Sequence, residues 1–281
     1  MLYICATPIG NLDDISLRAI KILSLADRIL CEDTRVSRHL LNAHNINHKQ
    51  VTTLNEHNEN EVADQIMGQL AAGLVIVLIS DAGTPGISDP GARLCNKVRA
   101  AGFAISPIPG ACAYISLLSV SGLLNTPSLF HGFLPHQSTA RCKILSTWEH
   151  VDYAVCIYEA PHRIIACMQD IIATLGSERS IIMGRELTKH FETIKKCTCG
   201  ELLEFIQADP NQQRGEFALI IEPKMKTEDS SEALTTEQIN LLKLLLPELP
   251  PKKAVALTHK IAGGHKDLLY NYTLTAKTEN K

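Results

Sequence analysis

Short apolar runs rich in valine and isoleucine alternate with longer amphipathic segments along most of this 281-residue chain. Such a run predicts a strand buried in a sheet, and apolar residues spaced three and four apart predict a helix with one buried face. The predicted strands are residues 2–7, 28–31, 51–54, 74–80, 104–108, 128–133, 153–158, 180–185 and 216–221. The predicted helices are residues 15–25, 37–42, 59–72, 92–101, 111–120, 139–147, 162–175 and 200–208. This alternation is typical of α/β domains.

Two passages interrupt the alternation. Residues 121–127 contain glycine and proline between two sets of α/β units, and residues 223–236 are polar with few large apolar side chains. From Glu237 onward the pattern is helical alone. The predicted parts are an N-terminal α/β domain at 1–122, a second α/β domain at 123–223, a linker at 224–236 and a small helical C-terminal extension at 237–281.

The composition is that of a folded protein, with 45% hydrophobic and 20% charged residues. The longest apolar stretch, residues 70–79, is interrupted by Gly73 and has about half of the ~20 residues that a membrane helix needs. The chain begins with a strand-like run and not with the basic and apolar regions of a secretory signal. We therefore expect a cytoplasmic protein without a membrane span.

Cysteine and charge patterns narrow the choice of partners. The nine cysteines are scattered through apolar segments, which predicts reduced core residues. Cys197 and Cys199 are close together, but no second pair accompanies them, so we expect no metal site. The net charge of −3 gives no overall field that attracts nucleic acid. Residues 247–281, however, carry six lysines against three acidic residues and could form a local basic patch.

Loops rich in small residues follow three of the first predicted strands. The longest, SDAGTPGISDPG at 80–91, exposes backbone amides and short side chains that suit a small polar ligand, and its two aspartates could bond ribose hydroxyls or face a substrate. It lacks the Gly-Lys-Ser/Thr ending of a phosphate loop, and no GxGxxG follows the first strand. Residues 7–12 and 107–113 are similar loops. Because ligands bind at the carboxyl ends of strands in α/β sheets, the three loops predict one cleft.

Charged motifs follow other strands. YEAPHR at 158–163, RELTK at 185–189 and EDTR at 32–35 each combine an acid with a base. An isolated surface ion pair would contribute under ~1 kcal/mol. Their repetition at strand ends favours a ligand-binding edge instead.

Together these motifs resemble the ribosomal RNA small-subunit methyltransferase I family of the tetrapyrrole methylase superfamily. The resemblance covers residues 1–222 and rests on eight ordered motifs: TPIGNLDDISLRA, EDTR, SDAGTPGISDPG, PIPGACA, HGFLP, YEAPHR, RELTK and GEFALII. The serine of SDAGTP stands where many superfamily members with tetrapyrrole substrates carry glycine followed by Asp-Pro, which favours the RNA-modifying branch. The helical tail resembles the family's C-terminal extension.

The resemblance implies S-adenosylmethionine bound in a cleft between two α/β domains, a homodimer, and no metal. It also implies 2′-O-methylation of a cytidine ribose in the decoding region of small-subunit (16S) RNA, with ribosomal RNA or the 30S subunit as partner. The residues that we expect to bind the cofactor are Thr7, Pro8, Ser80, Asp81, Ala82, Gly83, Ala111, Cys112, Tyr158, Met183 and Gly184.

Transfer of a methyl group to a ribose also needs help in removing the hydroxyl proton. The candidate catalytic residues, each in a polar segment just beyond a strand, are Glu186, Lys189, Asp33 and Glu56. The candidate RNA contacts are Arg35, Arg163, Arg185, Lys189, Lys252 and Lys253. Two alternatives stay open: a superfamily methyltransferase acting on a small molecule such as a tetrapyrrole, and a non-catalytic ribosome-assembly or RNA-binding protein. The basic tail discriminates against the small-molecule enzyme.

Overall fold

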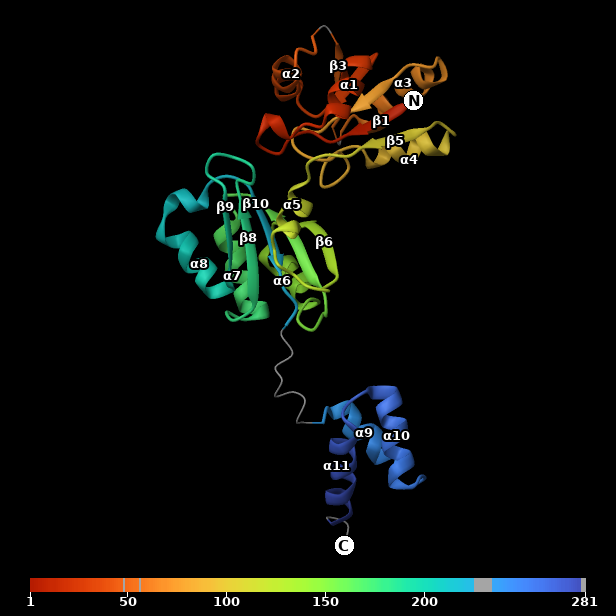
Figure 1. Cartoon of the computed structure of the whole chain (residues 1–281), viewed down its shortest axis with the longest axis vertical. Coiled ribbons are helices and arrows are strands. Elements are labelled where there is room, and N and C mark those ends of the chain that lie inside the picture. Colours follow the sequence, from red (N-terminus) through yellow and green to blue (C-terminus); the bar gives the residue numbers. More distant parts are fainter. Residues whose placement is uncertain (48, 56, 225–233, 279–281) are drawn as a thin grey trace. The chain divides into compact units, whose positions relative to one another are not determined.

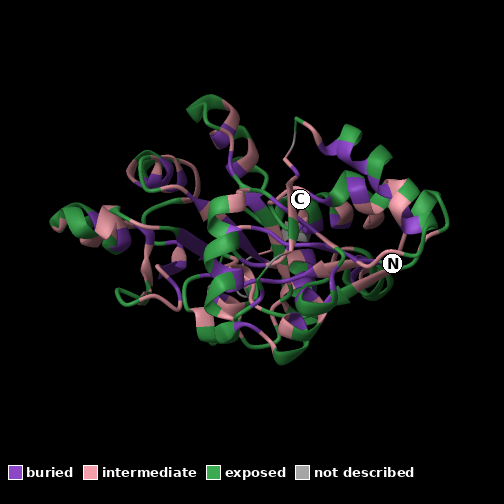
Figure 2. Cartoon of the chain, turned by 90° about the horizontal axis from the view of Figure 1, so that it is seen from above, coloured by how far each residue is buried: buried purple, intermediate pink, exposed green. Residues whose placement is uncertain are grey.

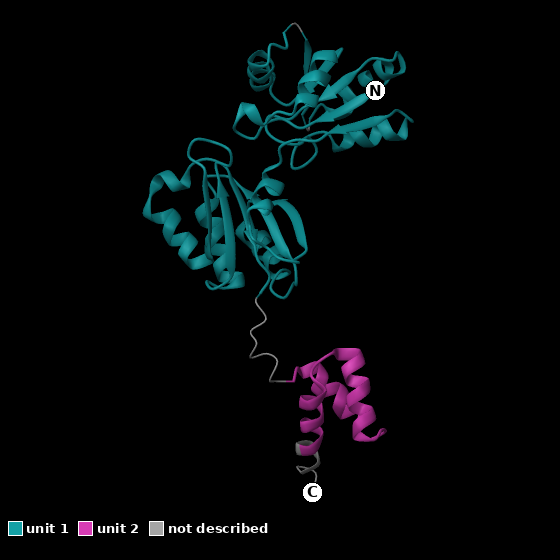
Figure 3. Cartoon of the chain, in the orientation of Figure 1, with its two compact units in different colours: residues 1–224 teal, residues 225–281 magenta. Residues whose placement is uncertain are grey.

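The computed structural model describes residues 1–47, 49–55, 57–224 and 234–278. The chain divides into two compact units, residues 1–224 and 225–281 (Figure 3). Unit 1 contains two five-stranded sheets with their helices, and the described part of unit 2 consists of helices (Figure 1). The predicted α/β class with a helical C-terminal segment is therefore confirmed.

The first sheet is entirely parallel, as expected for strands joined by helices. Its strands in spatial order are β3 (Gln50–Thr53), β2 (Arg28–Cys31), β4 (Ile76–Leu78), β1 (Leu2–Cys5) and β5 (Ile105–Ile108). The accompanying helices are α1 (Leu17–Leu25), α2 (Thr34–Ala43), α3 (Glu59–Ala71) and α4 (Ala92–Ala100). Apolar clusters form on both faces of the sheet, one with α1 and α2 and the other with α3 and α4. This explains why β4 is apolar without alternation.

The second sheet is mixed. Its strands in spatial order are β6 (Ser128–Phe133), β7 (Ala154–Glu159), β10 (Phe217–Ile221), β8 (Ser180–Arg185) and β9 (Thr193–Thr198). Its helices are α5 (Ala113–Ser119), α6 (Ser138–Ser146), α7 (Ile164–Leu175) and α8 (Cys199–Ala208). Because β10 runs antiparallel to both neighbours, Phe217 pairs with Glu159 and with Arg185. The carboxyl ends of β7 and β8 and the amino end of β10 therefore meet at one edge.

All nine predicted strands are present, and the structure adds a tenth, β9, that the apolar pattern does not predict. This edge strand alternates half-buried and exposed residues and carries Lys195 and Lys196 in its middle. Its apolar signal is weak because only one of its edges is paired, and charges on such a strand oppose further pairing. In Figure 2 the buried residues follow the strands and the inner faces of the helices. All nine cysteines are free, and five of them are buried.

The second unit has its own apolar core. Helices α9 (Thr236–Leu245), α10 (Pro251–Ala262) and α11 (Lys266–Thr278) pack around Leu242, Ala254, Val255 and Leu269. Thr235 and Gln238 form a reciprocal capping box at the start of α9. The predicted helical extension is confirmed, and most of the predicted linker lies outside the described residues. In the described part of the chain no helix is both long and apolar enough to span a membrane.

Candidate functional site

The loops that follow the strands of the first sheet are tied together by hydrogen bonds. The backbone of Thr7 pairs with that of Gly83, and the Thr7 hydroxyl donates to the carbonyl oxygen of Ser80 at 3.1 Å. The Thr84 hydroxyl donates to the carbonyl oxygen of Ala111 at 3.0 Å. The loops after β1, β4 and β5 thus form one rigid edge, as the sequence predicts for a cleft.

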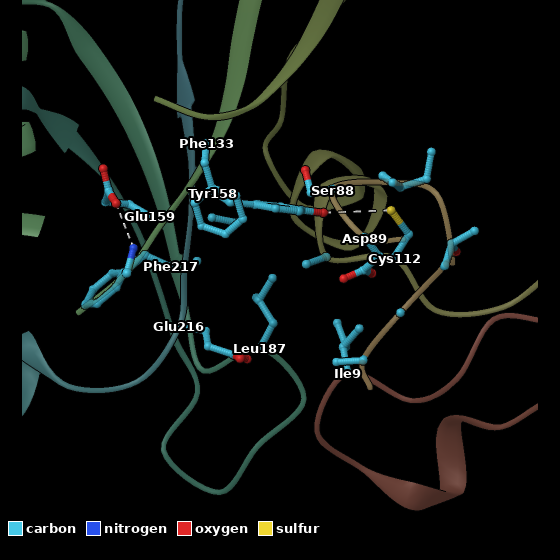
Figure 4. A pocket seen from close by; sticks show the side chains of 18 of the residues that line it. Ile9, Ser88, Asp89, Cys112, Phe133, Tyr158, Glu159, Leu187, Glu216 and Phe217 are labelled. Atoms are coloured by element: carbon cyan, nitrogen blue, oxygen red, sulfur yellow. Dashed lines mark hydrogen bonds between the residues drawn. The ribbon is translucent and has the colours of Figure 1, made fainter. Parts of the chain in front are cut away.

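A cavity of about 380 Å³ opens where these loops face the second sheet. Figure 4 shows Ile9, Asp89 and Cys112 on one side, and Phe133 and Tyr158 on the other. The lining residues are 9, 81–84, 87–89, 112–113, 133, 158–161, 184, 187 and 216–218. The cavity therefore draws on strand ends of both sheets.

The charged residues of the wall are all acidic. The four carboxylates are those of Asp81, Asp89, Glu159 and Glu216, and none of the described lining residues is a lysine, arginine or histidine. Burial is the largest cause that raises the pKa of Asp81. Burial, followed by the charges of Glu32 and Asp81, raises the pKa of Asp89 to about 7. Such a wall favours a cationic ligand and repels a phosphate.

Aromatic and apolar side chains make up the rest of the wall. Tyr158 stacks edge-on against Phe133, with 5.8 Å between the ring centroids. Burial raises the pKa of Tyr158, so its hydroxyl stays neutral. That hydroxyl accepts a hydrogen bond from the backbone amide of Tyr114 and lies 3.9 Å from the Cys112 sulfur. Flat apolar surfaces beside an acidic patch suit a ligand that is partly aromatic and partly cationic.

Six of the eleven residues predicted to bind the cofactor line this cavity: Asp81, Ala82, Gly83, Cys112, Tyr158 and Gly184. The other five support it or lie elsewhere. Thr7 and Ser80 are buried and hold the loop that contains Gly83. Pro8 is buried, and the Ala111 carbonyl oxygen accepts the hydrogen bond from the Thr84 hydroxyl. Met183 packs in the core between the sheet and its outer helices, on the face opposite Gly184.

None of the predicted proton acceptors that the structure describes lines the cavity. The Asp33 carboxylate caps α2 and bonds the Arg35 guanidinium, and these bonds lower its pKa to about 2. Burial opposes the charge of Glu186, but hydrogen bonds from Lys189 and the Glu216 amide outweigh it and lower its pKa. A carboxylate held in this way is a weak base. Glu56 lies outside the described residues.

The predicted RNA contacts divide into buried and exposed groups. Arg163 pairs with the buried Glu159 and donates to the Leu134 carbonyl oxygen, whereas Arg185 donates to the carbonyl oxygens of Arg214 and Phe191. Both guanidinium groups are used inside the protein. The side chain of Arg35 is 90% exposed. Lys189 is paired with Glu186 and Glu216 at the rim, and Lys252 and Lys253 are exposed on α10.

Several lining residues were not singled out from the sequence. Asp89 was recognised only as one of two aspartates in its loop that could bond ribose hydroxyls or face a substrate. Glu216 directly precedes β10 in a recognised motif, but its side chain was not singled out. Ile9, Phe133 and Leu187 are apolar and gave no chemical signal. Their participation depends on how the two sheets face each other.

The chain is similar to known proteins over nearly its whole length. Residues 1–203 match the family model described as "Tetrapyrrole (Corrin/Porphyrin) Methylases", and residues 232–277 match the "RsmI C-terminal HTH domain". Curated proteins named "Ribosomal RNA small subunit methyltransferase I" are similar to the chain over nearly the full length of both. The one from Neisseria meningitidis serogroup A is 44% identical over 99% of this chain and 94% of its own. The one from Haemophilus influenzae is 43% identical over 98% of this chain and 96% of its own.

A solved structure supports the fold. A cobalt precorrin-4 methyltransferase of cobalamin biosynthesis aligns with a TM-score of 0.58 at 16% identity. The alignment covers 78% of this chain and 93% of that one. At this identity the likeness shows the shared architecture.

Proposed function

This chain belongs to the tetrapyrrole methylase family and, within it, to the ribosomal RNA small subunit methyltransferases I, and on that premise we propose that it methylates the 2′-oxygen of a cytidine ribose in the decoding region of small-subunit RNA. It is an S-adenosylmethionine-dependent methyltransferase. The acid-lined cavity at the strand ends of both sheets is the observation that carries the proposal.

The cavity fits S-adenosylmethionine in charge and in shape. The cofactor carries a sulfonium and an ammonium against one carboxylate, so its net charge is positive. Of the four acids in the described lining, Glu159 and Glu216 are in ion pairs, which leaves Asp81 and Asp89 to attract a cation. Ile9, Phe133 and Tyr158 supply apolar and aromatic surface for an adenine ring. Gly83 has a φ of +85°, and a Cβ at this position would contact Ile9 in the cavity wall. Because glycine has no side chain, a ligand can approach the backbone here.

The role of the chain's own residues is to position the reacting groups and to hold the cavity in shape. When bound, S-adenosylmethionine supplies an electrophilic methyl group. The loops after β1, β4 and β5, joined through Thr7, Gly83 and Ala111, fix one side of the cavity without rearrangement. A fixed geometry aligns the attacking oxygen with the methyl carbon, which is the main requirement of a direct displacement.

The RNA backbone needs positive charge that the cavity lacks. We propose that only the target ribose approaches the cavity and that its flanking phosphates contact Arg35 and Lys189 on unit 1. Lys252 and Lys253 on α10 would add contacts from unit 2, whose helices match a helix-turn-helix family model. Because Arg163 and Arg185 bond internal carbonyl oxygens, we leave them out of the proposed RNA surface.

We also propose that the protein acts in the cytoplasm as a homodimer. Ile115, Val120 and Leu124, on and after α5, are 56%, 55% and 85% exposed, so three large apolar side chains within a short stretch of the chain face solvent. A second copy would cover them. Sedimentation of the parent and of Leu124→Asp compares the two states, and a parent that sediments as a monomer would contradict the dimer.

The experiment that tests the reaction uses purified protein, labelled S-adenosylmethionine and 30S subunits from cells that lack this protein. We expect the label to enter the RNA and to appear, after digestion, as 2′-O-methylcytidine. Label in a base, in another nucleoside or in no RNA at all would contradict the proposal. Transfer to a tetrapyrrole alone would favour the small-molecule alternative.

A further inference from the structure

Two of the four carboxylates in the cavity wall have structural partners that fix their role. Asp81 accepts a hydrogen bond from the backbone amide of Asp33 at 3.0 Å, which ties the loop after β4 to the start of α2. Glu159 forms an ion pair with Arg163, with 3.0 Å between the Nε and Oε1 atoms, and its side chain is fully buried. These two acids hold the walls of the cavity in place.

The third carboxylate, that of Glu216, is 73% exposed and pairs with Lys189 at 2.9 Å. Asp89 differs from all three. Within the described residues no lysine, arginine or histidine forms an ion pair with it, and no backbone amide donates to it. Figure 4 shows its carboxylate directed into the cavity, between Cys112 and Leu187. Its hydrogen-bond partner is Ser80, so Asp89 is the wall acid with most capacity left for a ligand.

The loop around Asp89 fixes this orientation at a conformational cost. Ser88 has a φ of +62°, in the left-handed region that costs a residue other than glycine ~1–3 kcal/mol. Gly86 and Gly91, with φ of +80° and +131°, flank it. The Ser88 hydroxyl lies 2.9 Å from the position that a Cβ of Gly132 would occupy, so it rests against the bulge in β6. The loop is wedged against the second sheet, with Asp89 held beside the apolar wall.

The surroundings of Asp89 make its carboxylate more basic than an exposed one. Burial has the largest effect on its pKa, and the negative charges of Glu32 after β2, Asp81 after β4 and Glu216 before β10 act in the same direction. A hydrogen bond with Ser80 opposes them. The resulting pKa of about 7 allows the group to exchange a proton near neutral pH, where a general base is most effective.

Resting on the proposed function, we propose that Asp89 is the general base that accepts the proton of the ribose 2′-hydroxyl during methyl transfer. The O–H bond breaks and its proton passes to a carboxylate oxygen of Asp89, while the 2′-oxygen forms the new bond to the methyl carbon. The carbon–sulfur bond breaks, and its electron pair stays on sulfur as a neutral thioether. Asp89 then releases the proton to solvent.

The test compares Asp89→Asn with the parent in single-turnover methylation of 30S subunits that lack the modification. We expect the rate at pH 8 and saturating cofactor to fall by ~100-fold or more, since general bases typically contribute ~10²- to 10⁴-fold. The S-adenosylmethionine Kd is measured by calorimetry, so that any weaker cofactor binding from the loss of one wall carboxylate is separated from the loss of turnover at saturation. Asp152→Asn is the matched control, because Asp152 is exposed in the bend at the opposite end of β7 from Glu159.

A second measurement, the pH profile of the parent, does not depend on the folding of a variant. The parent's single-turnover rate should rise with pH, reach half of its maximum at about pH 7 and level off near pH 8. The Asp89→Asn variant, where it folds, should lose this rise. A flat parent profile between pH 6 and 8 would overturn the proposal. An Asp89→Asn variant with parental turnover, or with weaker cofactor binding but parental turnover at saturation, would overturn it too. If the parent itself forms no 2′-O-methylcytidine, the proposed function fails rather than this assignment.

Discussion

Tyr158 of β7 accepts a hydrogen bond from the backbone amide of Tyr114, with 2.9 Å between the phenolic oxygen and the nitrogen. Tyr114 lies in the first turn of α5, where backbone amides have no partner within the helix. Tyr158 also lines the cavity. One side chain of the second sheet therefore forms part of the cavity wall and fixes the helix that follows the PIPGACA loop.

Tyr158→Phe should loosen this connection. The Tyr114 amide would lose its acceptor in a half-buried position, which costs ~1–3 kcal/mol of folding stability. We expect a lower melting temperature and a several-fold weaker S-adenosylmethionine Kd, measured by differential scanning calorimetry and titration calorimetry. Tyr153→Phe removes a hydroxyl from the bend that directly precedes β7, beside the outer core, and serves as the control. Equal behaviour of the two variants would refute the connecting role.

Gly83→Ala should weaken cofactor binding more than its backbone strain explains. Gly83 has a φ of +85°, and an added Cβ would lie 3.3 Å from Cγ2 of Ile9 in the cavity wall. Gly73 has nearly the same φ, +83°, and no atom within 4 Å of an added Cβ. Both alanine variants should lose ~1–2 kcal/mol of stability from the left-handed backbone. The S-adenosylmethionine Kd should rise by ~10-fold, or ~1.4 kcal/mol, in Gly83→Ala alone, and a parental Kd there would remove Gly83 from the site.

The raised pKa of Asp89 makes a prediction about stability. The group titrates near 3.8 when unperturbed and at about 7 in the folded protein, so between these values the folded state holds a proton that the unfolded state has released. The free energy of unfolding therefore falls as pH rises through this window, because the folded state must give up a proton that it binds more tightly than the unfolded state does. Asp89→Asn should raise the melting temperature by about 2–4 °C at pH 8, the shift that ~1 kcal/mol produces in a domain of this size, and by little at pH 4.5. A difference independent of pH would contradict the raised pKa.

Reversing the charge of Lys252 and Lys253 should weaken RNA binding and leave cofactor binding unchanged. Both side chains are exposed on α10. Each phosphate contact releases counterions and contributes about 0.7 to the slope of log affinity against log salt for single-stranded RNA. The variant with both Lys252→Glu and Lys253→Glu should therefore show a shallower slope of log affinity against log salt, whereas Lys21→Glu on α1 should not. Parallel slopes for parent and double variant would exclude these lysines from the RNA surface.

The sequence predicted the elements better than the site. Nine strands and their helices followed from apolar periodicity, because both faces of each sheet bury apolar clusters. The loop at 80–91 was recognisable because glycine and proline mark its turns. The edge strand β9, with Lys195 and Lys196, was missed because an exposed edge needs few apolar residues.

Individual roles within the motifs depended on contacts that no local pattern encodes. Arg185 and Glu186 occupy one motif, yet Arg185 is turned inward to carbonyl oxygens and Glu186 is held by Lys189. Met183 and Gly184 are neighbours in β8, but strand alternation places one in the outer core and the other in the cavity wall. Alternation puts the two residues on opposite faces, but which face borders the cavity depends on how the two sheets face each other.

The proposed reaction leaves a methylated nucleoside in the cell's own RNA, so mass spectrometry of small-subunit RNA from cells with and without this protein tests it at its product. We expect the loss of one methyl group from a single cytidine ribose in the decoding region. The parent gene should restore this methyl group, and the Gly83→Ala variant should not when cofactor is limiting. An unchanged set of methylated nucleosides in the deletion strain would contradict the proposed reaction.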